Sequence, residues 1–368
     1  MKTALHDIRC MTRALQLAAR GRGRTSPNPM VGAVVVSGGR TVGEGFHRQA
    51  GGPHAEVIAL QAAGSRAKGG TLYVTLEPCS HTNKRTPPCV PAILAAGIRH
   101  VVVAMRDPNP RVNGEGLRQL KRAGVRLSVG CLEERAVQLN ASYVHRMRTG
   151  RPLIVLKMAM TLDGKTATAS GESQWITGPE ARRHAHHLRS QVDAIMVGVN
   201  TVLADDPQLT VRLGHPIARQ PLRVIMDSRL RTPLAANLLS QRLRRGTVLA
   251  TTHYASKIRL ARLRQRGIQI LVLPSERGQV SLRACLRQLA KMGINQLLLE
   301  GGSELAASAL RSGVVDRLRL YIAARLLGGN DAKGIIGGFC PPRLARALSV
   351  SGLSVKKIGR DLILEGTL

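Results

Sequence analysis

The chain has 368 residues, which at the usual ~100 to 200 residues per domain predicts two domains. Its 43% hydrophobic and 2% aromatic residues predict an aliphatic core and argue against a disordered chain. No apolar run approaches the ~18 residues that cross a bilayer, and the first residues carry scattered charges where a signal peptide would be apolar, so we expect a soluble, intracellular protein.

The chain is strongly basic, with a formal net charge of +33 at pH 7. Clustered Lys and Arg residues would indicate nucleic-acid binding, because they displace counterions from phosphate backbones. Here the excess is spread, at +14 over residues 1–150 (22 basic against 8 acidic) and +19 over residues 151–368 (33 against 14). The chain also offers almost no aromatic residue on which bases could stack. The charge therefore favours a solvated, Arg-rich surface over a dedicated polyanion-binding face, although either would attract small phosphorylated molecules.

The first half alternates between strand-like and helix-like patterns. Short β-branched runs predict buried strands at 31–36, 71–76, 100–104 and 125–130. Helix-length patterns lie at about 4–20, about 54–66, 89–97 and 132–148. Alternation of this kind is typical of an α/β domain.

A cluster of turn-forming residues, TGRP at 149–152, precedes the strand-like LIVLKMAM. We place the domain boundary at about 146–152, which gives domains of residues 1–146 and 147–368. The second half repeats the alternation, with strands expected at 194–198, 222–227, 247–252, 268–274, 294–302 and 317–323. Helices are expected at about 178–191, 255–266, 281–292 and 303–312.

Three potential metal ligands stand at element boundaries in the first half. His54 lies at a predicted helix start, Cys79 follows a strand and a Glu-Pro break, and Cys89 opens the helix CVPAILAAG. A catalytic zinc ion takes about three protein ligands and keeps a further position for water. Glu56, two residues after His54, is well placed to take a proton from that water and pass it to a leaving amine. The combination predicts a deaminase site with one zinc ion per chain.

The spacing of the two cysteines differs from the short form of this motif. Zinc deaminases are described by H-x-E followed by P-C-x-x-C. Here HAE and PC match, but nine residues separate Cys79 from Cys89. Alone, HAE also fits a helix with a glutamate in its first turn, so only the combination favours a metal site. His81, inside the cysteine loop, is a possible competing ligand that we leave outside the predicted set.

The chain resembles the bifunctional deaminase/reductase family of riboflavin biosynthesis over nearly its whole length. The resemblance rests on TSPNPMVGAVVV (25–36), HAEVIAL (54–60), TLEPCSHTNKRTPPCV (75–90), DPNPRVNGEGL (107–117), KMAMTLDGKTAT (157–168), GESQWITG (171–178) and TVLADDPQLTVR (201–212). The long cysteine loop ending in RTPPC is this family's form of the deaminase motif, so the unusual spacing supports the resemblance.

For residues 1–146 the resemblance implies a cytidine-deaminase-like three-layer domain. Zinc would bind His54, Cys79 and Cys89, with Glu56 as the proton shuttle. The implied substrate is 2,5-diamino-6-(5-phosphoribosylamino)pyrimidin-4-one, hydrolysed at the carbon of the 2-amino group with loss of ammonia. Asn28, in the loop SPNPM, is a candidate contact to the pyrimidine edge, with a plain turn as the alternative.

The second half lacks a G-x-G-x-x-G motif after its first strand, so a Rossmann dinucleotide domain is not indicated. Instead, a buried strand is expected to end at Glu300, two glycines follow, and Ser303 begins a helix. The backbone amides of such a turn could meet a phosphate at the positive end of the helix. A tight turn capped by Ser303 fits the same residues.

For residues 147–368 the resemblance implies a dihydrofolate-reductase-like domain that uses NADPH to reduce the ribosyl group of the deaminated product to ribityl. The implied cofactor contacts are Ala159, Trp175, Thr201, Asp205, Ser228, Gly302, Ser303, Glu304, Leu305, Ala306, Ala307 and Ser308. The implied substrate contacts are Ser173, Arg189, Leu209, Arg212 and Glu300. Lys157 and Asp163 are further candidates near this site. The two arginines have planar forks that suit a phosphate, and the single Trp has a flat apolar face.

Two rival interpretations remain at this point. A zinc deaminase acting on a nucleic-acid base would suit the charge but leaves residues 150–368 unexplained. A basic nucleic-acid-binding protein with a structural zinc would need a fourth ligand, for which only His81 is at hand. We therefore expect a cytoplasmic bifunctional enzyme that acts on a phosphoribosylaminopyrimidine, has no membrane partner, binds nucleic acid at most nonspecifically and forms a homo-oligomer.

Overall fold

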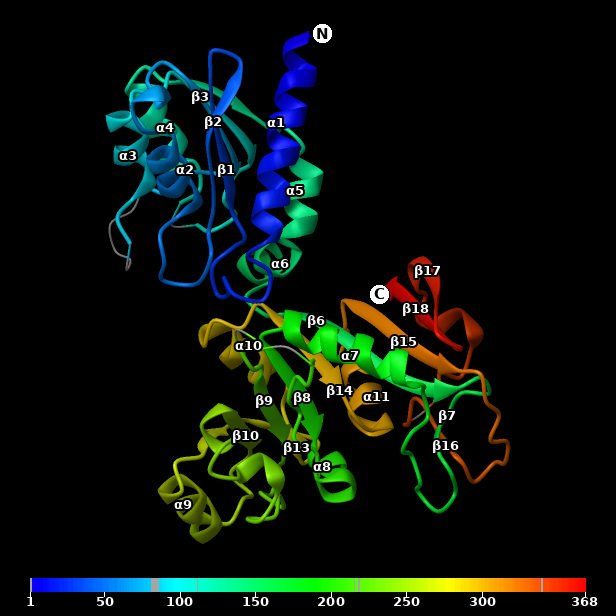
Figure 1. Ribbon diagram of the computed structural model, residues 1–368. Coiled ribbons are helices and arrows are strands. Elements are labelled where there is room, and N and C mark those ends of the chain that lie inside the picture. Colours follow the sequence, from blue (N-terminus) through cyan, green and yellow to red (C-terminus); the bar gives the residue numbers. More distant parts are fainter. Residues whose placement is uncertain (1, 81–85, 111, 215, 218, 339) are drawn as a thin grey trace. The chain divides into compact units, whose positions relative to one another are not determined.

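The computed structural model describes residues 2–80, 86–110, 112–214, 216–217, 219–338 and 340–368 (Figure 1). The chain divides into two compact units, Met1–Gly150 and Arg151–Leu368. Each unit is built around one large β-sheet and has its own hydrophobic core.

The first unit contains a five-stranded sheet in the order β2-β1-β3-β4-β5. Its strands are β1 (Gly32–Ser37), β2 (Arg40–Phe46), β3 (Thr71–Leu76), β4 (His100–Met105) and β5 (Arg126–Val129). Its helices are α1 (Lys2–Ala19), α2 (Ala55–Ala63), the short 3-10 helix η1 (Gly64–Ala67), α3 (Cys89–Ala95), α4 (Glu115–Arg122), α5 (Glu133–Leu139) and α6 (Ala141–Thr149). Strand β1 pairs antiparallel with β2 and β3, whereas β3, β4 and β5 run parallel.

Helices cover both faces of this sheet, because alternate strand residues point to opposite sides. Ala33 and Val35 of β1 pack in one core cluster with α2, α3 and α4. Val34 and Val36 pack in another cluster with α1, α5 and α6. Figure 1 shows the resulting helix–sheet–helix layers. The arrangement confirms the expected three-layer α/β domain.

Strand β2 lies unusually close to α2, the helix that follows His54. A Cβ atom added to Gly45 would lie 2.5 Å from the carbonyl oxygen of Ala55 and 2.6 Å from the amide nitrogen of Ala59. At Gly43 the corresponding atom would lie 2.2 Å from the carbonyl oxygen of Ala59. Both obstacles are helix backbone, which cannot move aside as a flexible side chain would. The two glycines therefore fix how closely α2 approaches the sheet.

The second unit contains a nine-stranded sheet in the order β11-β10-β9-β8-β14-β6-β15-β18-β17. Its strands are β6 (Leu153–Thr161), β7 (Lys165–Ala167), β8 (Ala194–Gly198), β9 (Leu222–Met226), β10 (Thr247–Thr251), β11 (Gln269–Val272), β12 (Ser275–Glu276), β13 (Gln279–Val280), β14 (Gln296–Glu300), β15 (Arg317–Ala323), β16 (Lys333–Gly334), β17 (Ser351–Ile358) and β18 (Asp361–Thr367). Its helices are α7 (Pro179–Gln191), α8 (Val199–Asp205), α9 (Lys257–Gln265), α10 (Leu282–Lys291) and α11 (Ser303–Arg311), with 3-10 helices η2 (Asn237–Leu239), η3 (Arg244–Gly246) and η4 (Leu344–Arg346).

Parallel pairing makes the carboxyl ends of the central strands meet at one edge of this sheet. Strand β14 lies between β8 and β6, and all three run parallel. Helices α10 and α11 bury their apolar side chains against these strands. The loops after β6, β8, β9 and β14 therefore gather at the same edge, which is where open α/β sheets place their ligands.

Most elements predicted from hydrophobic patterning are present, and the structure adds several more, including the short helix α8. Strand β2 and helix α4 were not predicted, because RTVGEGF and EGLRQLKR contain few apolar residues. The C-terminal hairpin β17–β18 was also not predicted, and β17 is exposed along almost its whole length. The single helix expected at 132–148 is two helices, which meet at Asn140. The Asn140 side chain bonds both backbone groups of Met30, so it serves the adjacent loop instead of a continuous helix.

Within the described residues, no helix is both long and apolar enough to cross a membrane.

Replacing Gly45 by Ala is expected to destabilise the first unit by about 1–3 kcal/mol, because the new methyl group would overlap the backbone of α2. Calorimetric unfolding of the wild type and the variant would measure the change. Gly214→Ala is the control, since nothing lies within 4 Å of a Cβ atom added there. Equal stability of Gly45→Ala and wild type would contradict the close packing of β2 on α2.

Candidate functional site

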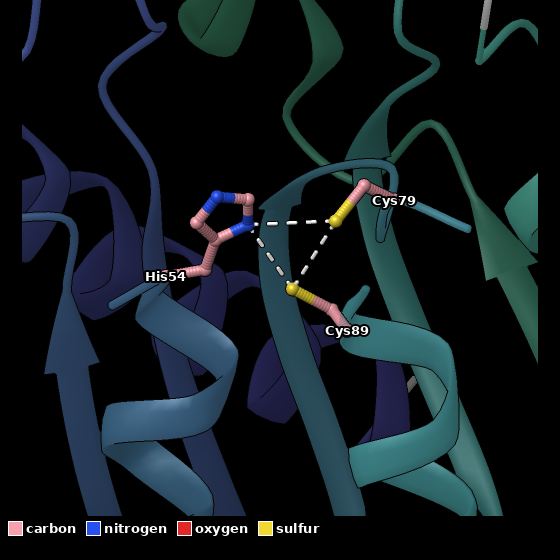
Figure 2. Close-up of side chains that lie close together, drawn as sticks. All are labelled: His54, Cys79 and Cys89. Carbon is pink, nitrogen blue, oxygen red and sulfur yellow. Dashed lines mark hydrogen bonds between the residues drawn. The ribbon is translucent and has the colours of Figure 1, made fainter. Parts of the chain in front are cut away.

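The three predicted metal ligands converge in the first unit, although they come from separate elements. His54 caps the start of α2, Cys79 lies in the loop after β3, and Cys89 is the first residue of α3. Figure 2 shows the His54 ring directed at both sulfur atoms. Its Nδ1 atom lies 3.2 Å from Cys89 Sγ and 3.4 Å from Cys79 Sγ, and the two sulfur atoms are 3.4 Å apart.

This donor set fits a tetrahedral zinc ion. Zinc binds thiolate sulfur at about 2.3 Å and imidazole nitrogen at about 2.0 Å, which puts neighbouring ligand atoms about 3.5–3.8 Å apart. The observed separations are a few tenths of an ångström shorter, so a small outward movement of the side chains would accommodate the ion. Three ligands would leave one tetrahedral position for water.

Neighbouring groups hold the ligands in place. Thr86 Oγ1 lies 3.0 Å from His54 Nε2, which orients the imidazole so that Nδ1 faces the sulfur atoms. The backbone amides of Cys89 and Val90 donate to the carbonyl of Cys79, at 3.0 and 3.3 Å. These bonds tie the start of α3 to the Cys79 loop. The position of Cys89 at a helix N-terminus also favours its thiolate form.

Glu56 lies on the first turn of α2 with only 2% of its surface exposed. Its Oε2 atom is buried and has no hydrogen-bond partner within the part of the chain that the structure describes. Burial raises the pKa of this carboxyl group, and the charge of Cys79 raises it further. A buried carboxylate oxygen without a partner is costly unless a ligand supplies one, and a water molecule held at the metal position would do so.

Asn28 contacts His47, which in turn packs against the metal ligand His54. Its Nδ2 atom is 3.2 Å from His47 Nε2, and the His47 and His54 rings are 5.5 Å apart, edge to face. His47 Nδ1 lies 3.0 Å from the carbonyl oxygen of Pro53, and burial lowers the pKa of this imidazole. Sequence patterning did not identify His47, since a single His after a strand carries no motif. His81, the possible competing ligand, lies outside the described residues.

In the second unit, three of the predicted residues form a buried ion-pair cluster. Glu300 ends β14, Lys157 lies on β6, and Arg189 lies on α7. The Arg189 fork donates to both Glu300 oxygens, at 2.8 and 2.7 Å, and Lys157 Nζ lies 3.8 Å from Oε2. Burial acts to raise the pKa of Glu300, but the charges of Arg189 and Lys157 outweigh it and hold the pKa at about 2. Burial lowers the pKa of Lys157.

The glycine turn after Glu300 lies against α8. Gly301 has a φ of +127°, which side-chain-bearing residues rarely adopt, and Gly302 caps α11. The Gly302 amide donates to Thr201 Oγ1 at 3.2 Å. A Cβ atom on Gly301 would lie 3.0 Å from the same oxygen. The turn therefore leaves bare backbone at the start of α11, beside a residue predicted to contact the cofactor.

The remaining predicted residues lie in loops and strand ends of the second unit. Ser228 follows β9, where its hydroxyl donates to Gln279 and accepts from the amide of Val280. Trp175 is 59% exposed, with the Arg182 guanidinium 4.7 Å from its ring centre. The other predicted positions are Ala159 on β6, Ser173 in the loop before α7, Asp205 at the end of α8, and Leu209 and Arg212 in the following loop.

Two of these placements bear on phosphate binding. The Arg189 guanidinium is occupied by Glu300 and by the carbonyl oxygen of Thr210 at 3.2 Å. Arg212, in contrast, has an exposed side chain. Its backbone amide donates to His186 Nδ1 at 3.2 Å, which places Arg212 beside α7.

Asp163 joins two segments of the second unit. It accepts hydrogen bonds from the Thr161 hydroxyl at 2.6 Å and from the amide of Gly328 at 2.7 Å. These bonds hold its pKa at about 2, well below the usual range for an aspartate. The residue therefore links the loop after β6 to the loop after β15.

Two family models match the chain, one in each unit. Residues 5–105 match the zinc-binding region of cytidine and deoxycytidylate deaminases, and residues 152–364 match the RibD C-terminal domain. The first match contains His54, Cys79 and Cys89, and the second contains the Glu300 cluster.

Similar proteins cover the chain almost completely. It is 45% identical to the riboflavin biosynthesis protein RibD of Actinobacillus pleuropneumoniae, over 98% of this chain and 94% of that protein. It is 44% identical to RibD of Escherichia coli, over 98% and 99% of the two chains. Among solved structures, RibD of Acinetobacter baumannii has a TM-score of 0.90 at 39% identity, with 99% of each chain covered.

A structure from Thermotoga maritima is named as a diaminohydroxyphosphoribosylaminopyrimidine deaminase/5-amino-6-(5-phosphoribosylamino)uracil reductase. It has a TM-score of 0.85 at 32% identity, and 99% of each chain is covered.

These similarities confirm several predictions made from the sequence. The resemblance, the fold class of both halves and the prediction of a bifunctional enzyme are confirmed. The prediction of zinc is confirmed by the zinc-binding family model together with the His54, Cys79 and Cys89 cluster, and the reductase match supports NADPH as the second cofactor. Neither nucleic-acid interpretation accounts for the second unit. The chain belongs to the RibD family of bifunctional deaminase/reductase enzymes of riboflavin biosynthesis.

Proposed function

We propose that the first unit hydrolyses the amino group from 2,5-diamino-6-(5-phosphoribosylamino)pyrimidin-4-one. The observation that carries the proposal is the convergence of His54 Nδ1, Cys79 Sγ and Cys89 Sγ next to the buried carboxylate of Glu56. The proposed deaminase domain of residues 1–146 falls within the first unit, and the proposed reductase domain of residues 147–368 contains the whole of the second.

The deamination replaces a C–N bond of the pyrimidine with a C–O bond and releases ammonia. His54, Cys79 and Cys89 would hold the zinc ion, which would lower the pKa of a water molecule towards neutrality and so supply a nucleophile. Glu56 takes the proton from the attacking water at its carboxylate and delivers it to the leaving amino group. Burial raises the pKa of Glu56 above its usual value, which makes the carboxyl group easier to protonate and suits a group that must both accept and donate a proton. Asn28, held by His47, orients the pyrimidine edge.

The second unit then reduces the ribosyl group of the deaminated product to ribityl. NADPH would supply the hydride, and residues of the second unit would hold its nicotinamide ring for transfer to the sugar carbon. The Ser303 amide at the start of α11 would bind a cofactor phosphate, and Gly302, whose own amide donates to Thr201, would let the phosphate approach the backbone closely. The other proposed cofactor contacts are Ala159, Trp175, Thr201, Asp205, Ser228 and the first turns of α11 from Glu304 to Ser308.

Substrate binding in the reductase divides between an exposed arginine and the buried ion-pair cluster. Arg212 has an exposed guanidinium that suits a phosphate. The Glu300 carboxylate accepts a hydrogen bond from a hydroxyl group of the sugar, and Arg189 holds that carboxylate in position. Ser173 and Leu209 complete the proposed contacts. Lys157, whose pKa is lowered by burial, is a candidate proton donor next to Glu300.

The proposed setting is the cytoplasm, and the proposed assembly is a homo-oligomer. The described cysteines are all free of disulfide bonds, which suits a compartment that keeps metal-binding thiols reduced. The expected partner is the phosphoribosylaminopyrimidine itself, and the Arg-rich surface would attract nucleic acid only nonspecifically.

Glu56→Gln is expected to reduce ammonia release by roughly 10²- to 10⁴-fold, because the amide cannot carry the proton. The zinc content of the variant should remain one ion per chain, and NADPH oxidation with the pre-deaminated substrate should be unchanged. Glu134→Gln, which alters an exposed carboxylate on α5, is the control. Normal ammonia release by Glu56→Gln would refute the proton-shuttle role.

Cys79→Ser and Cys89→Ser are each expected to lose most of the bound zinc, since a hydroxyl is a much poorer zinc ligand than a thiolate. Metal analysis of the purified full-length protein measures the content. Cys131→Ser, at a half-buried position outside the cluster, should retain one zinc ion per chain. If zinc stays bound with unchanged affinity in both cluster variants, other residues must be the ligands.

Arg212→Gln is expected to raise the KM of the reduction step about 10- to 100-fold by removing a charge-assisted contact to the phosphate. Its ammonia release should stay at the wild-type level. Arg264→Gln, which removes an exposed charge from α9, should leave both rates unchanged. An unchanged KM in Arg212→Gln would place the substrate phosphate elsewhere.

A further inference from the structure

The first unit has a cleft that the proposed deaminase chemistry does not use. It lies between α1 and the hairpin formed by β1 and β2, and its volume is about 490 Å³. Residues His6, Arg9 and Arg13 of α1 form one wall, and Arg40 and Glu44 of β2 line the other side. A cleft of this volume is within the range that holds small metabolites.

The cleft and the metal ligands are on opposite faces of the five-stranded sheet. Val34, which lines the cleft, packs with α1, whereas its neighbours Ala33 and Val35 pack with α2 and α3. Figure 1 shows α1 and α2 on the two sides of β1. The sheet therefore separates the cleft from His54 and Cys89, and a molecule bound there would not reach the metal site.

The charges in the cleft are mostly uncompensated. Arg13 donates to both oxygens of Glu44, at 2.9 and 2.7 Å, so these two charges neutralise each other. Arg9 and Arg40 have no side-chain hydrogen bond or ion pair to any residue that the structure describes. Two guanidinium groups thus face one cleft without an anionic partner, which favours binding of a phosphate group.

The other residues that line the cleft indicate which kind of phosphorylated molecule it would bind. Thr41 and the His6 ring add polar groups, and none of the residues that line the cleft is Phe, Tyr or Trp. A nucleobase would therefore find only the small His6 ring on which to stack, whereas the hydroxyl groups of a sugar would find several donors and acceptors. We propose that the cleft between α1 and the β1–β2 hairpin is a second binding site, separate from the deaminase site, for a phosphorylated sugar.

Hydrogen–deuterium exchange of the zinc-loaded full chain tests this proposal, with ribose 5-phosphate as the probe. The compound is expected to slow exchange in residues 5–15 and 38–44, which carry the two walls of the cleft. The readout is local, so binding of the same compound at either active site would be seen in other segments. Unphosphorylated ribose should give no protection, because it lacks the group that the arginines bind.

The double variant Arg9→Gln/Arg40→Gln is expected to raise the apparent Kd for ribose 5-phosphate, measured from this protection, roughly tenfold or more. Two charge-assisted contacts to the phosphate are lost in this variant. The control Arg99→Gln/Arg122→Gln removes the same charge from exposed positions of the same unit, away from the cleft. It should bind as the wild type does. Both double variants should release ammonia at the wild-type rate, which shows that the metal site remains folded.

Three results would overturn the proposal. The first is the absence of protection in these segments at millimolar ribose 5-phosphate. The second is equal weakening in both double variants, which would reflect general attraction to a basic protein. The third is protection by inorganic phosphate at the same concentration as ribose 5-phosphate, which would mean that the sugar contributes nothing to binding.

Discussion

The first unit depends on bringing two sulfur atoms and an imidazole nitrogen within about 3.4 Å of one another beside a buried carboxylate. Burying such groups together is unfavourable when they carry negative charge, because each loses its hydration and repels the others. A cation bound between these groups would make their close burial favourable, because it attracts each of them. The packing of α2 against β2, the ties between α3 and the Cys79 loop, and the Thr86 contact to His54 all serve this one geometry.

The second unit also buries a carboxylate, and its own side chains compensate the charge. Glu300 is nearly as buried as Glu56, but Arg189 and Lys157 compensate its charge within the fold. The carboxylate consequently stays ionised and fixed in direction at the end of β14. Glu56 has no Arg or Lys partner among the described residues, and it has a raised pKa and an oxygen atom without a hydrogen-bond partner there. The contrast suits a proton shuttle in one unit and a fixed hydrogen-bond acceptor in the other.

Hydrophobic patterning predicted the central strands and most helices because those elements bury one or both faces. It did not predict β2, α4 or β17, whose residues are mostly polar or exposed. It also joined α5 and α6, because the role of Asn140 depends on Met30, which is 110 residues away in the sequence. Contacts of that range leave no periodic signal in the chain.

The sequence by itself predicted the chemistry of the metal site, since H-x-E, P-C and a second Cys at a helix start indicate the ligand types and the proposed proton carrier. It also determined the family, through motifs spread over nearly the whole chain. The tertiary structure decided which atoms meet. It directed His54 Nδ1 at the sulfur atoms and placed His47 between Asn28 and the metal ligands. In the second unit it paired the Arg189 guanidinium with Glu300. In the first unit it placed Arg9 and Arg40 at a cleft on the opposite face of the sheet from the metal ligands. These outcomes depend on the packing of distant segments, because the direction of a side chain follows from the elements around it and not from its neighbours in the chain.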